Sequence, residues 1–509
     1  FHAPENAPSD FMRGLARQDL LGYAFAAFLL NEHGLRVLPS LSAQLTLRIQ
    51  PPYVVTDDST DKLIAGLTAL AEVVMTGDFY GLTAHLVGES ATPPRRIKHR
   101  PRIDEPPPQG VNRVGFVAHF IEPEHIRSRD HSLESLPTPH CAPYVQRVSG
   151  VVGPACYERG VIRSITGDTV HFSFFGLPQT SRDFANAIAD RKVSELRARV
   201  QEGVDLAMQS GCQVIGLGGF TSIVTNNCRS LDSPGVALTS GNSLTVMMAL
   251  EALLEAAKRR QIRTSEARLA TLGATGNIGE VFCELAAEHV GSIALIGRPR
   301  SDRTGRLERL GARLWDNALT QLRNHQSGEL QGIARTVSKQ MHEMGETDFT
   351  RHNGAELFAL STAHFGLDAA VVVTDAKAAL ATADLVLGAS SAAEPLITTD
   401  LIPRKPIVIC DISTPPDTHP AVAKLPNVTA IGGGLVELPC NAEFSIGGVA
   451  LEPGVVFACM AESMVLGLSG ILQHYSYGPV EASKVHRITA LAKLHGFRLA
   501  RSKALWPVK

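Results

Sequence analysis

The segment Ala267–Ala286 constrains the fold of this chain more than any other. A short apolar strand, expected over Leu269–Leu272, runs into three glycines at GxxGxxG spacing and then into an apolar helical stretch. Glycines placed between a strand and a helix permit a tight turn, a close approach to a pyrophosphate and close helix–strand packing. The N–H groups at the start of the helix and its dipole would hold phosphates. We therefore predict dinucleotide contacts from Gly273, Thr275, Gly276, Asn277, Ile278 and Gly279, against the alternative of a plain strand–helix turn.

The next apolar strand, Ser292–Ile296, indicates which dinucleotide is bound. An acidic residue about 20 positions after the glycines is typical of NAD sites, because it bonds the ribose hydroxyls. Here Arg298 and Arg300 follow the strand instead, and guanidinium groups suit a phosphate. The pattern predicts NADPH as cofactor, unless Arg298 is only a surface charge. Ala389 and Ser390 end a later strand on the side of the sheet where the nicotinamide would lie.

From Arg113 onward, apolar strands alternate with helices, which predicts an α/β fold with a Rossmann-like, doubly wound parallel sheet. We expect a substrate domain over 112–240, an NADPH-binding domain over 241–440 and a helical segment over 441–509 that completes the structure. Residues 311–367 are polar and poorly periodic and are interpreted as an insertion. Residues 1–88 predict a small α+β piece, followed by a proline- and arginine-rich linker over 89–111.

Composition excludes several classes of protein. Hydrophobic residues make up 44% and charged residues 19% of the 509 positions, which is typical of a globular chain rather than a disordered one. A net charge of -2 argues against nucleic-acid binding, and the longest apolar run is too short to span a bilayer. The eight cysteines form no CxxC pair, so neither a metal site nor a disulfide scaffold is expected, and the compartment is predicted to be the cytoplasm.

One cysteine stands out as a candidate nucleophile. Cys440 follows the glycine run 432–434 and Pro439, on a loop just past the strand expected over Val428–Ile431. Loops at the carboxyl ends of parallel strands are where such folds bind ligands, and an exposed cysteine there can react as a thiolate. The alternative is an inert core residue.

The region 113–500 resembles the cyanobacterial long-chain acyl-[acyl-carrier-protein] reductases. Six segments carry the resemblance, in the same order: Val114–His119, Gly216–Ile223, Thr239–Asn242, Gly273–Gly279, Gly433–Glu437 and Phe457–Glu462. The resemblance implies NADPH as cofactor and a reactive cysteine shortly after the GG-x-V-E stretch, which is Cys440. Cys459, in an apolar helical run, is expected to be a packing residue. Two departures, Leu438-Pro439 before the cysteine and the long connection before Ala369, leave acyl length open.

The resemblance implies reduction of a fatty acyl thioester to an aldehyde through an acyl-enzyme, with the acyl group carried on acyl carrier protein or coenzyme A. Thr239 and Asn242 are candidate donors to the oxyanion, although both suit simple helix capping. His119, at the end of a predicted strand, is a candidate acid or base, although its position favours a structural, hydrogen-bonded histidine. Peripheral lipid contact and oligomerisation are compatible with the sequence.

Residues 1–88 resemble the C-terminal end of a class III pyridoxal-phosphate aminotransferase, through Leu30–Pro39, Leu47–Pro52 and the helix after Thr56. That family's cofactor lysine lies upstream of this portion, so pyridoxal phosphate is not expected on these residues. The resemblance suggests part of a transaminase–reductase fusion, in which the aldehyde becomes an amine.

Two other functions fit the dinucleotide signal. The first is an NADP-dependent dehydrogenase of a small carbonyl or amino-acid substrate, with no covalent step. The second is a cofactor-binding regulatory or scaffold module without turnover. Loss of activity on replacing Cys440 would separate the acyl-enzyme reductase from the first, and turnover of any acyl thioester would exclude the second.

Overall fold

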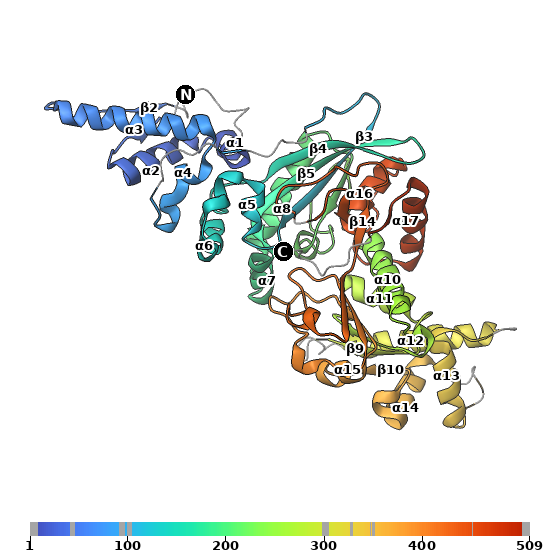
Figure 1. The fold of residues 1–509 in the computed structure, drawn as a ribbon. Coiled ribbons are helices and arrows are strands. Elements are labelled where there is room, and N and C mark those ends of the chain that lie inside the picture. Colours follow the sequence, from blue (N-terminus) through green and yellow to red (C-terminus); the bar gives the residue numbers. More distant parts are fainter. Residues whose placement is uncertain are drawn as a thin grey trace.

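The computed structural model describes residues 9–40, 46–90, 97–98, 104–297, 305–325, 329–346, 348, 352–449 and 451–500. Two α/β bodies and an N-terminal helical module make up these residues (Figure 1). Among the described helices, none combines the length and apolar character needed to cross a membrane.

The N-terminal module lies at one end of the molecule (Figure 1). Its elements are α1 (Asp10–Arg17), α2 (Leu21–His33), β1 (Leu38–Pro39), β2 (Leu47–Arg48), α3 (Asp57–Thr76), α4 (Phe79–Thr83) and the 3-10 turn η1 (Ala84–Val87). The predicted helix after Thr56 is confirmed, with the Thr56 hydroxyl accepting from the Ser59 N–H at 3.2 Å.

This module shares a core with the segment that follows strand β3 (Asn112–Phe120). Phe11, Phe25 and Leu70 pack in one apolar cluster with Leu133 and Tyr144. The segment comprises α5 (His125–Arg129), η2 (His131–Ser135) and α6 (Thr138–Val148). The module is therefore joined to the rest of the chain by a continuous apolar core as well as by the linker.

The first α/β body is built on a five-stranded sheet in the order β4-β5-β3-β6-β7. Its strands are β3 (Asn112–Phe120), β4 (Ala155–Arg163), β5 (Thr169–Thr180), β6 (Val214–Leu217) and β7 (Ala237–Thr239). The β3, β5, β6 and β7 pairings are parallel, but β4 pairs antiparallel with β5. The sequence prediction of an all-parallel sheet missed this edge hairpin. The helices of this body are α7 (Ser181–Ala189), α8 (Ser194–Gln209) and α9 (Phe220–Val224).

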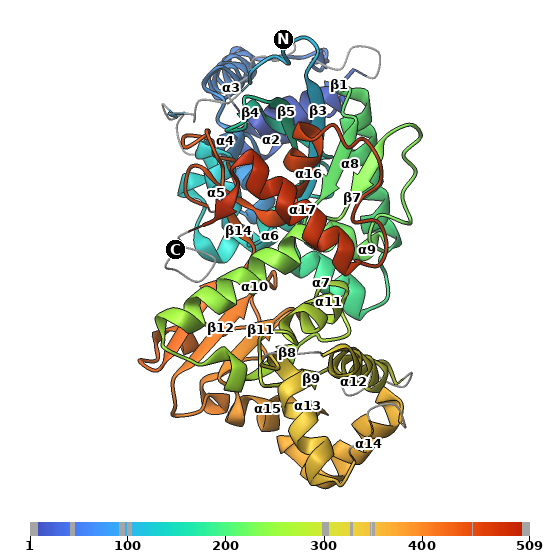
Figure 2. The same cartoon turned by 90° about the vertical axis from the view of Figure 1, so that its right-hand side faces the viewer.

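The second body is the predicted Rossmann-like domain, and it is confirmed. Six parallel strands stand in the order β10-β9-β8-β11-β12-β13, which is the doubly wound arrangement. They are β8 (Arg268–Leu272), β9 (Ser292–Ile296), β10 (Val371–Val373), β11 (Leu385–Gly388), β12 (Ile407–Asp411) and β13 (Val428–Gly432). The long helix α10 (Asn242–Arg259) crosses from the first body to the second (Figure 2). The domain also contains η3 (Thr264–Glu266), α11 (Asn277–Ala286), α15 (Ala376–Thr382), η5 (Thr399–Leu401) and η6 (Val422–Lys424).

The interpretation of 311–367 as poorly periodic is wrong. The structure has α12 (Arg306–Asn324), α13 (Gly332–Glu343), α14 (Gly354–Phe365) and η4 (Gly366–Asp368) in this part of the chain. Leu307, Leu310, Leu314, Ala318 and Leu322 lie buried along α12 at helical spacing, so the predicted boundary falls inside a helix. Polar neighbours between these positions conceal the pattern in the sequence.

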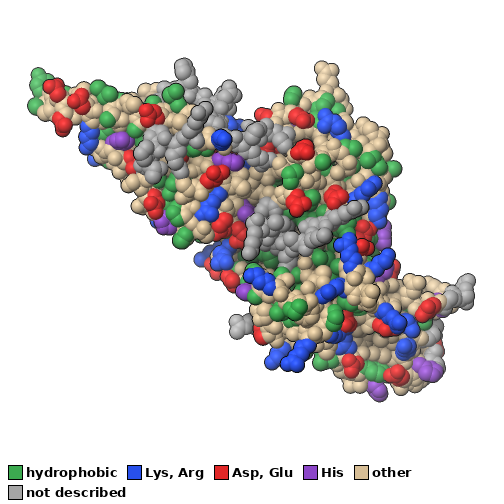
Figure 3. All heavy atoms as spheres, in the orientation of Figure 1, with side chains coloured by type: hydrophobic (Ala, Val, Ile, Leu, Met, Phe, Trp, Pro, Cys, Tyr) green, Lys and Arg blue, Asp and Glu red, His purple; other side chains and the backbone are tan. Residues whose placement is uncertain are grey.

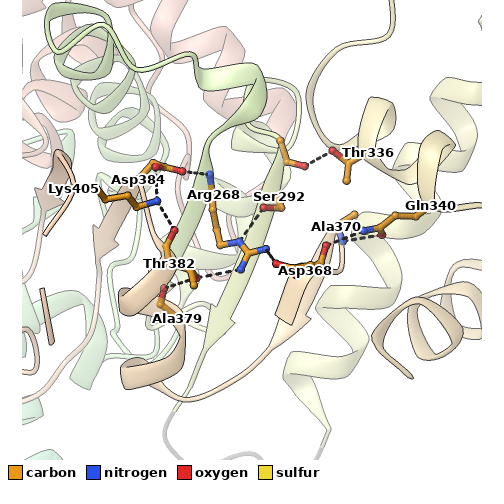
Figure 4. A network of polar contacts seen from close by, with 11 residues as sticks. Arg268, Ser292, Thr336, Gln340, Asp368, Ala370, Ala379, Thr382, Asp384 and Lys405 are labelled. Carbon is orange, nitrogen blue, oxygen red and sulfur yellow. Dashed lines mark hydrogen bonds and ion pairs between the residues drawn. The ribbon is translucent and has the colours of Figure 1, made fainter. Parts of the chain in front are cut away.

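Polar contacts close the amino-terminal edge of the Rossmann sheet (Figure 4). The Arg268 guanidinium donates to Thr382, Asp368 and Ser292, and its backbone N–H donates to Asp384. The Gln340 side chain of α13 bonds Asp368 and Ala370 at 2.8 and 2.9 Å, which ties the extra helices to the sheet. These contacts lie at the opposite end of the strands from the glycine turn.

The C-terminal part returns to the first body. It contains β14 (Leu435–Glu437), β15 (Val455–Phe457), α16 (Ala458–Leu468), α17 (Ala482–His495) and β16 (Arg498–Leu499). Helix α16 packs directly on β3, β5 and β6, with α17 outside it (Figure 2). The face seen in Figure 3 carries acidic and basic side chains interspersed, as expected from the net charge of -2.

Candidate active site

A cavity of about 720 Å³ lies between the carboxyl ends of the parallel strands of the two sheets. The Rossmann side contributes the glycine turn after β8 and the ends of β11 and β12, while the other side contributes the ends of β3 and β6. Pockets of roughly 300–1,000 Å³ at such sheet ends are the usual ligand sites of α/β proteins.

The glycine turn has the geometry needed for a dinucleotide. Gly273 has a φ of 75°, and a Cβ there would lie 2.4 Å from the Ala389 carbonyl oxygen. A Cβ on Gly279 would lie 2.3 Å from the Gly273 oxygen, so Gly279 serves helix packing and is not part of the lining. The other predicted contacts, Thr275, Gly276, Asn277, Ile278, Ala389 and Ser390, all line the cavity. A nicotinamide dinucleotide fits these residues, with its phosphates at the N-terminus of α11.

The predicted preference for NADPH over NADH depends on two arginines after β9. Arg298 and Arg300 lie outside the described residues. Arg306, which begins α12, does line the cavity, and its guanidinium donates to the carbonyl of Thr275 in the glycine turn. Arg306 was not predicted as a cavity residue, because the apolar pattern of the helix that it begins is hidden by polar neighbours in the sequence.

The two cysteines considered in the sequence, Cys440 and Cys459, lie in different places relative to the cavity. Cys440 is exposed and does not line the cavity, because the chain runs past the cavity at Gly433 and Gly434 before it reaches Cys440. Of the eight cysteines, all of which are described, Cys459 alone is in the lining. It stands in the first turn of α16, where it is half-buried and also packs against the apolar core, as expected for a packing residue.

The surroundings of Cys459 shift the acidity of its thiol. Burial raises the pKa of the Cys459 thiol to about 12, and the Glu462 charge acts in the same direction, while the backbone N–H groups of Met460, Cys459 and Gly219 act in the opposite direction. The sulfur is therefore protonated in the free protein. The same N–H groups and the start of α16 would favour the thiolate once it forms.

Glu462, one helical turn after Cys459, links α16 to the end of β7, to the start of α10 and to the segment around Ser476. It accepts hydrogen bonds from the Thr239 hydroxyl, from the Ser476 hydroxyl at 2.6 Å and from the Leu244 N–H at 2.8 Å. Burial raises the pKa of its carboxyl. Thr239 is thus committed to Glu462 and does not line the cavity, which contradicts its predicted place at the oxyanion. An acid in an otherwise apolar helical run was the available sequence signal for Glu462.

Asn242 and His119, by contrast, do line the cavity. The Asn242 amide donates to the Asn227 side chain at 3.4 Å. The His119 Nε2 accepts from the Phe220 N–H at 3.1 Å, and its Nδ1 lies 2.7 Å from the Phe120 carbonyl oxygen. Burial lowers the pKa of His119 to about 4, so the ring is neutral and orders the 218–220 turn.

Two further features were missed from the sequence. Asn226, Asn227 and Cys228 all have positive φ angles, between 50° and 73°, and the two asparagines line the cavity. Such strain is costly outside glycine and concentrates at functional sites. Asp411, at the end of β12, also lines the cavity; burial and the neighbouring Asp417 raise its pKa to about 7.

No known family model matches the chain. It is 22% identical to the long-chain acyl-[acyl-carrier-protein] reductase of Synechococcus elongatus, over 68% of this chain and 87% of that protein. It is 30% identical to the aminotransferase PigE of Serratia, but over only 22% of this chain and 14% of that protein.

Solved structures with related topology include L-tryptophan dehydrogenase from Nostoc punctiforme, 9% identical, covering 75% of this chain and 80% of that one with a TM-score of 0.27. Shikimate 5-dehydrogenase from Listeria monocytogenes is 10% identical, covering 76% and 99% with a TM-score of 0.27. The Rossmann-like domain, the cavity and the Synechococcus relative together support an enzyme of the nicotinamide-dependent oxidoreductase class.

Proposed function

We propose that the chain is an NADPH-dependent reductase that converts acyl thioesters, carried on acyl carrier protein or coenzyme A, to aldehydes through an acyl-enzyme on Cys459. The observation that carries this proposal is the position of Cys459, in the cavity that also contains the glycine turn. The distant similarity to an acyl-[acyl-carrier-protein] reductase supports the substrate class. Arg306 beside the glycine turn supports a phosphorylated dinucleotide.

The proposed reaction begins with attack of the Cys459 sulfur on the thioester carbonyl. The new carbon–sulfur bond forms as the carrier's carbon–sulfur bond breaks, and the thiol proton of Cys459 passes to the departing carrier thiol. The backbone N–H groups of Gly219 and Met460 lower the pKa of this thiol, and in the proposed reaction they stabilise the negative charge that develops beside the sulfur. NADPH, when bound, supplies a hydride to the acyl carbon. The aldehyde is then released and Cys459 recovers its proton.

The predicted transaminase partner remains a proposal as well. The short match to an aminotransferase fits the idea that the aldehyde product is passed on and aminated. A reactive aldehyde is a product that benefits from prompt conversion, which gives this arrangement a chemical reason.

The raised pKa of the Cys459 thiol favours a second candidate, a dehydrogenase that never uses the sulfur as a nucleophile. Mass spectrometry separates the two. The protein is incubated with decanoyl-coenzyme A without NADPH, digested and mapped. We expect a decanoyl group on Cys459, which NADPH then removes. An unmodified Cys459 with intact NADPH-dependent turnover would establish the noncovalent alternative, and acylation of Cys440 would restore the original assignment.

A further inference from the structure

We infer that the N-terminal module is part of the candidate active site, because Asp10 of α1 positions, through Arg129, a loop of the cavity wall. This loop consists of residues 447–449. Neither Asp10 nor Arg129 lines the cavity, so Asp10 is a positioning residue that acts through its partner. The inference goes beyond the proposed function, and only its kinetic test depends on that function.

The loop 447–449 lies close to the candidate nucleophile. Gly448 and Val449 line the cavity. Val449 packs on the apolar cluster that contains Met460, the residue after Cys459, and Val449 and Met460 together line a second, small void. A displacement of the loop would therefore change the space around the first turn of α16, where Cys459 stands.

Arg129 contacts the loop through its guanidinium group and through its aliphatic stem. The Nη1 of Arg129 donates to the Glu158 carboxylate at 3.2 Å and to the Gly447 carbonyl at 3.5 Å. The Gly447 N–H in turn donates to Glu158 at 3.5 Å. A Cβ on Gly448 would lie 3.3 Å from the Arg129 Cβ and 2.7 Å from the Phe120 ring. The loop backbone is therefore packed directly against Arg129 and Phe120.

Asp10 binds the other nitrogen of the same guanidinium group. It is paired with Nη2 of Arg129, and the side chains of Asp10, Arg129 and Glu158 are 9%, 3% and 2% exposed. Because a guanidinium is planar and rigid, the carboxylate on Nη2 and the groups on Nη1 constrain each other's positions. A buried guanidinium that loses one of two carboxylate partners is poorly compensated. Removal of the Asp10 charge should therefore shift Arg129 and release Gly447.

Asp10→Asn tests the inference, because it removes this charge with little change in volume. Cys459 is alkylated with iodoacetamide, without substrate or cofactor, and its labelling rate is followed by peptide mapping. We expect the rate to rise at least about threefold, since a released loop opens more often. The kcat/KM for decanoyl-coenzyme A should fall at least about tenfold, because the acyl group is misplaced. The Kd for NADPH should stay unchanged, since the glycine turn lies in the other α/β body.

Ser9→Ala is the matched control for a loosened N-terminal module. Ser9 is also buried, and its hydroxyl bonds Asp130 across the same junction. Among the described residues, its side chain contacts Asp130 and the Met12 N–H but not the loop 447–449. Ser9→Ala should lower Tm without changing the labelling rate or kcat/KM. Equal changes in Ser9→Ala and Asp10→Asn, or no change in Asp10→Asn, would overturn the inference.

Arg129→Lys provides the test if Asp10→Asn does not fold. Lysine keeps the positive charge between Asp10 and Glu158 but lacks the planar fork that also reaches Gly447. Its labelling rate and kcat/KM should shift in the same directions as in Asp10→Asn, and an unchanged labelling rate would contradict the inference. If the unmodified protein reduced no thioester, the proposed function would fail, while the labelling rates would still decide the inference.

Discussion

A Cβ atom on Gly241 would lie 2.3 Å from the Cα atom of Cys459. Gly241 has a φ of 71° and is the residue from which α10 starts, while Cys459 stands in the first turn of α16. The starts of these two helices therefore touch at the candidate nucleophile. Only a residue without a side chain permits this approach, so the position of the sulfur depends on a glycine more than 200 positions away in the sequence.

Replacing Gly241 by Ala should separate the two helices and displace the sulfur. We expect turnover to fall at least about a hundredfold, because a misplacement of around 1 Å costs this much in well-positioned sites. Gly235→Ala is the matched control: its φ is 74°, but no atom lies within 4 Å of the position of a Cβ. The steady-state rates of the two variants are compared at a temperature well below both Tm values. The difference between them reports the effect of the contact with α16. Similar losses in both would show that backbone strain alone is responsible.

Replacement of the two candidate cysteines should have opposite effects on activity. Cys459→Ala should lower aldehyde formation by about a thousandfold or more while leaving NADPH binding nearly unchanged, because the sulfur would be the attacking atom. Cys440→Ala should retain full activity, since Cys440 is exposed and outside the cavity lining. Aldehyde is quantified by gas chromatography and NADPH binding by fluorescence. Inactivity of Cys440→Ala with a normal Cys459→Ala would reverse the assignment.

Gly273→Ala should weaken cofactor binding by about tenfold or more. Its Cβ would meet the Ala389 carbonyl oxygen at 2.4 Å, and its φ of 75° is strained for alanine. Gly345→Ala, with a φ of 78° and open space around it, is the control for strain without a clash. Fluorescence titration with NADPH gives both Kd values. An unchanged Kd for Gly273→Ala would mean that the dinucleotide does not approach this turn.

The Asp411 carboxyl should make folding stability depend on pH in a defined direction. Burial and Asp417 raise its pKa from 3.8 to about 7, so the folded protein binds a proton that the unfolded chain releases between those values. This contribution is fully present below about pH 4 and is lost as pH rises through 7. Between pH 5 and 8, Tm should fall less in Asp411→Asn than in the unmodified protein. Parallel Tm profiles would contradict the raised pKa.

Much of the fold could be predicted from local pattern. The strands expected over Ser292–Ile296 and Val428–Ile431 are confirmed as β9 and β13, because buried parallel strands are short, continuous apolar runs. The glycine turn was also predicted from local pattern. The backbone conformation that it requires at Gly273 and the close packing that it requires at Gly279 both need glycine at those positions. The helix α12 was missed because its apolar positions are diluted by polar neighbours.

The sequence by itself determined the glycine turn, the alternation of strands and helices and the class of cofactor, because each depends on residues close together in the chain. Which cysteine faces the cavity was decided only by the tertiary structure. Cys440 and Cys459 lie 19 positions apart, yet the strand pair β14–β15 and the contact between Gly241 and α16 direct the chain so that Cys459 enters the cavity. Thr239 likewise turns from the cavity to Glu462, since a buried carboxylate requires hydrogen-bond donors that only folding brings to it.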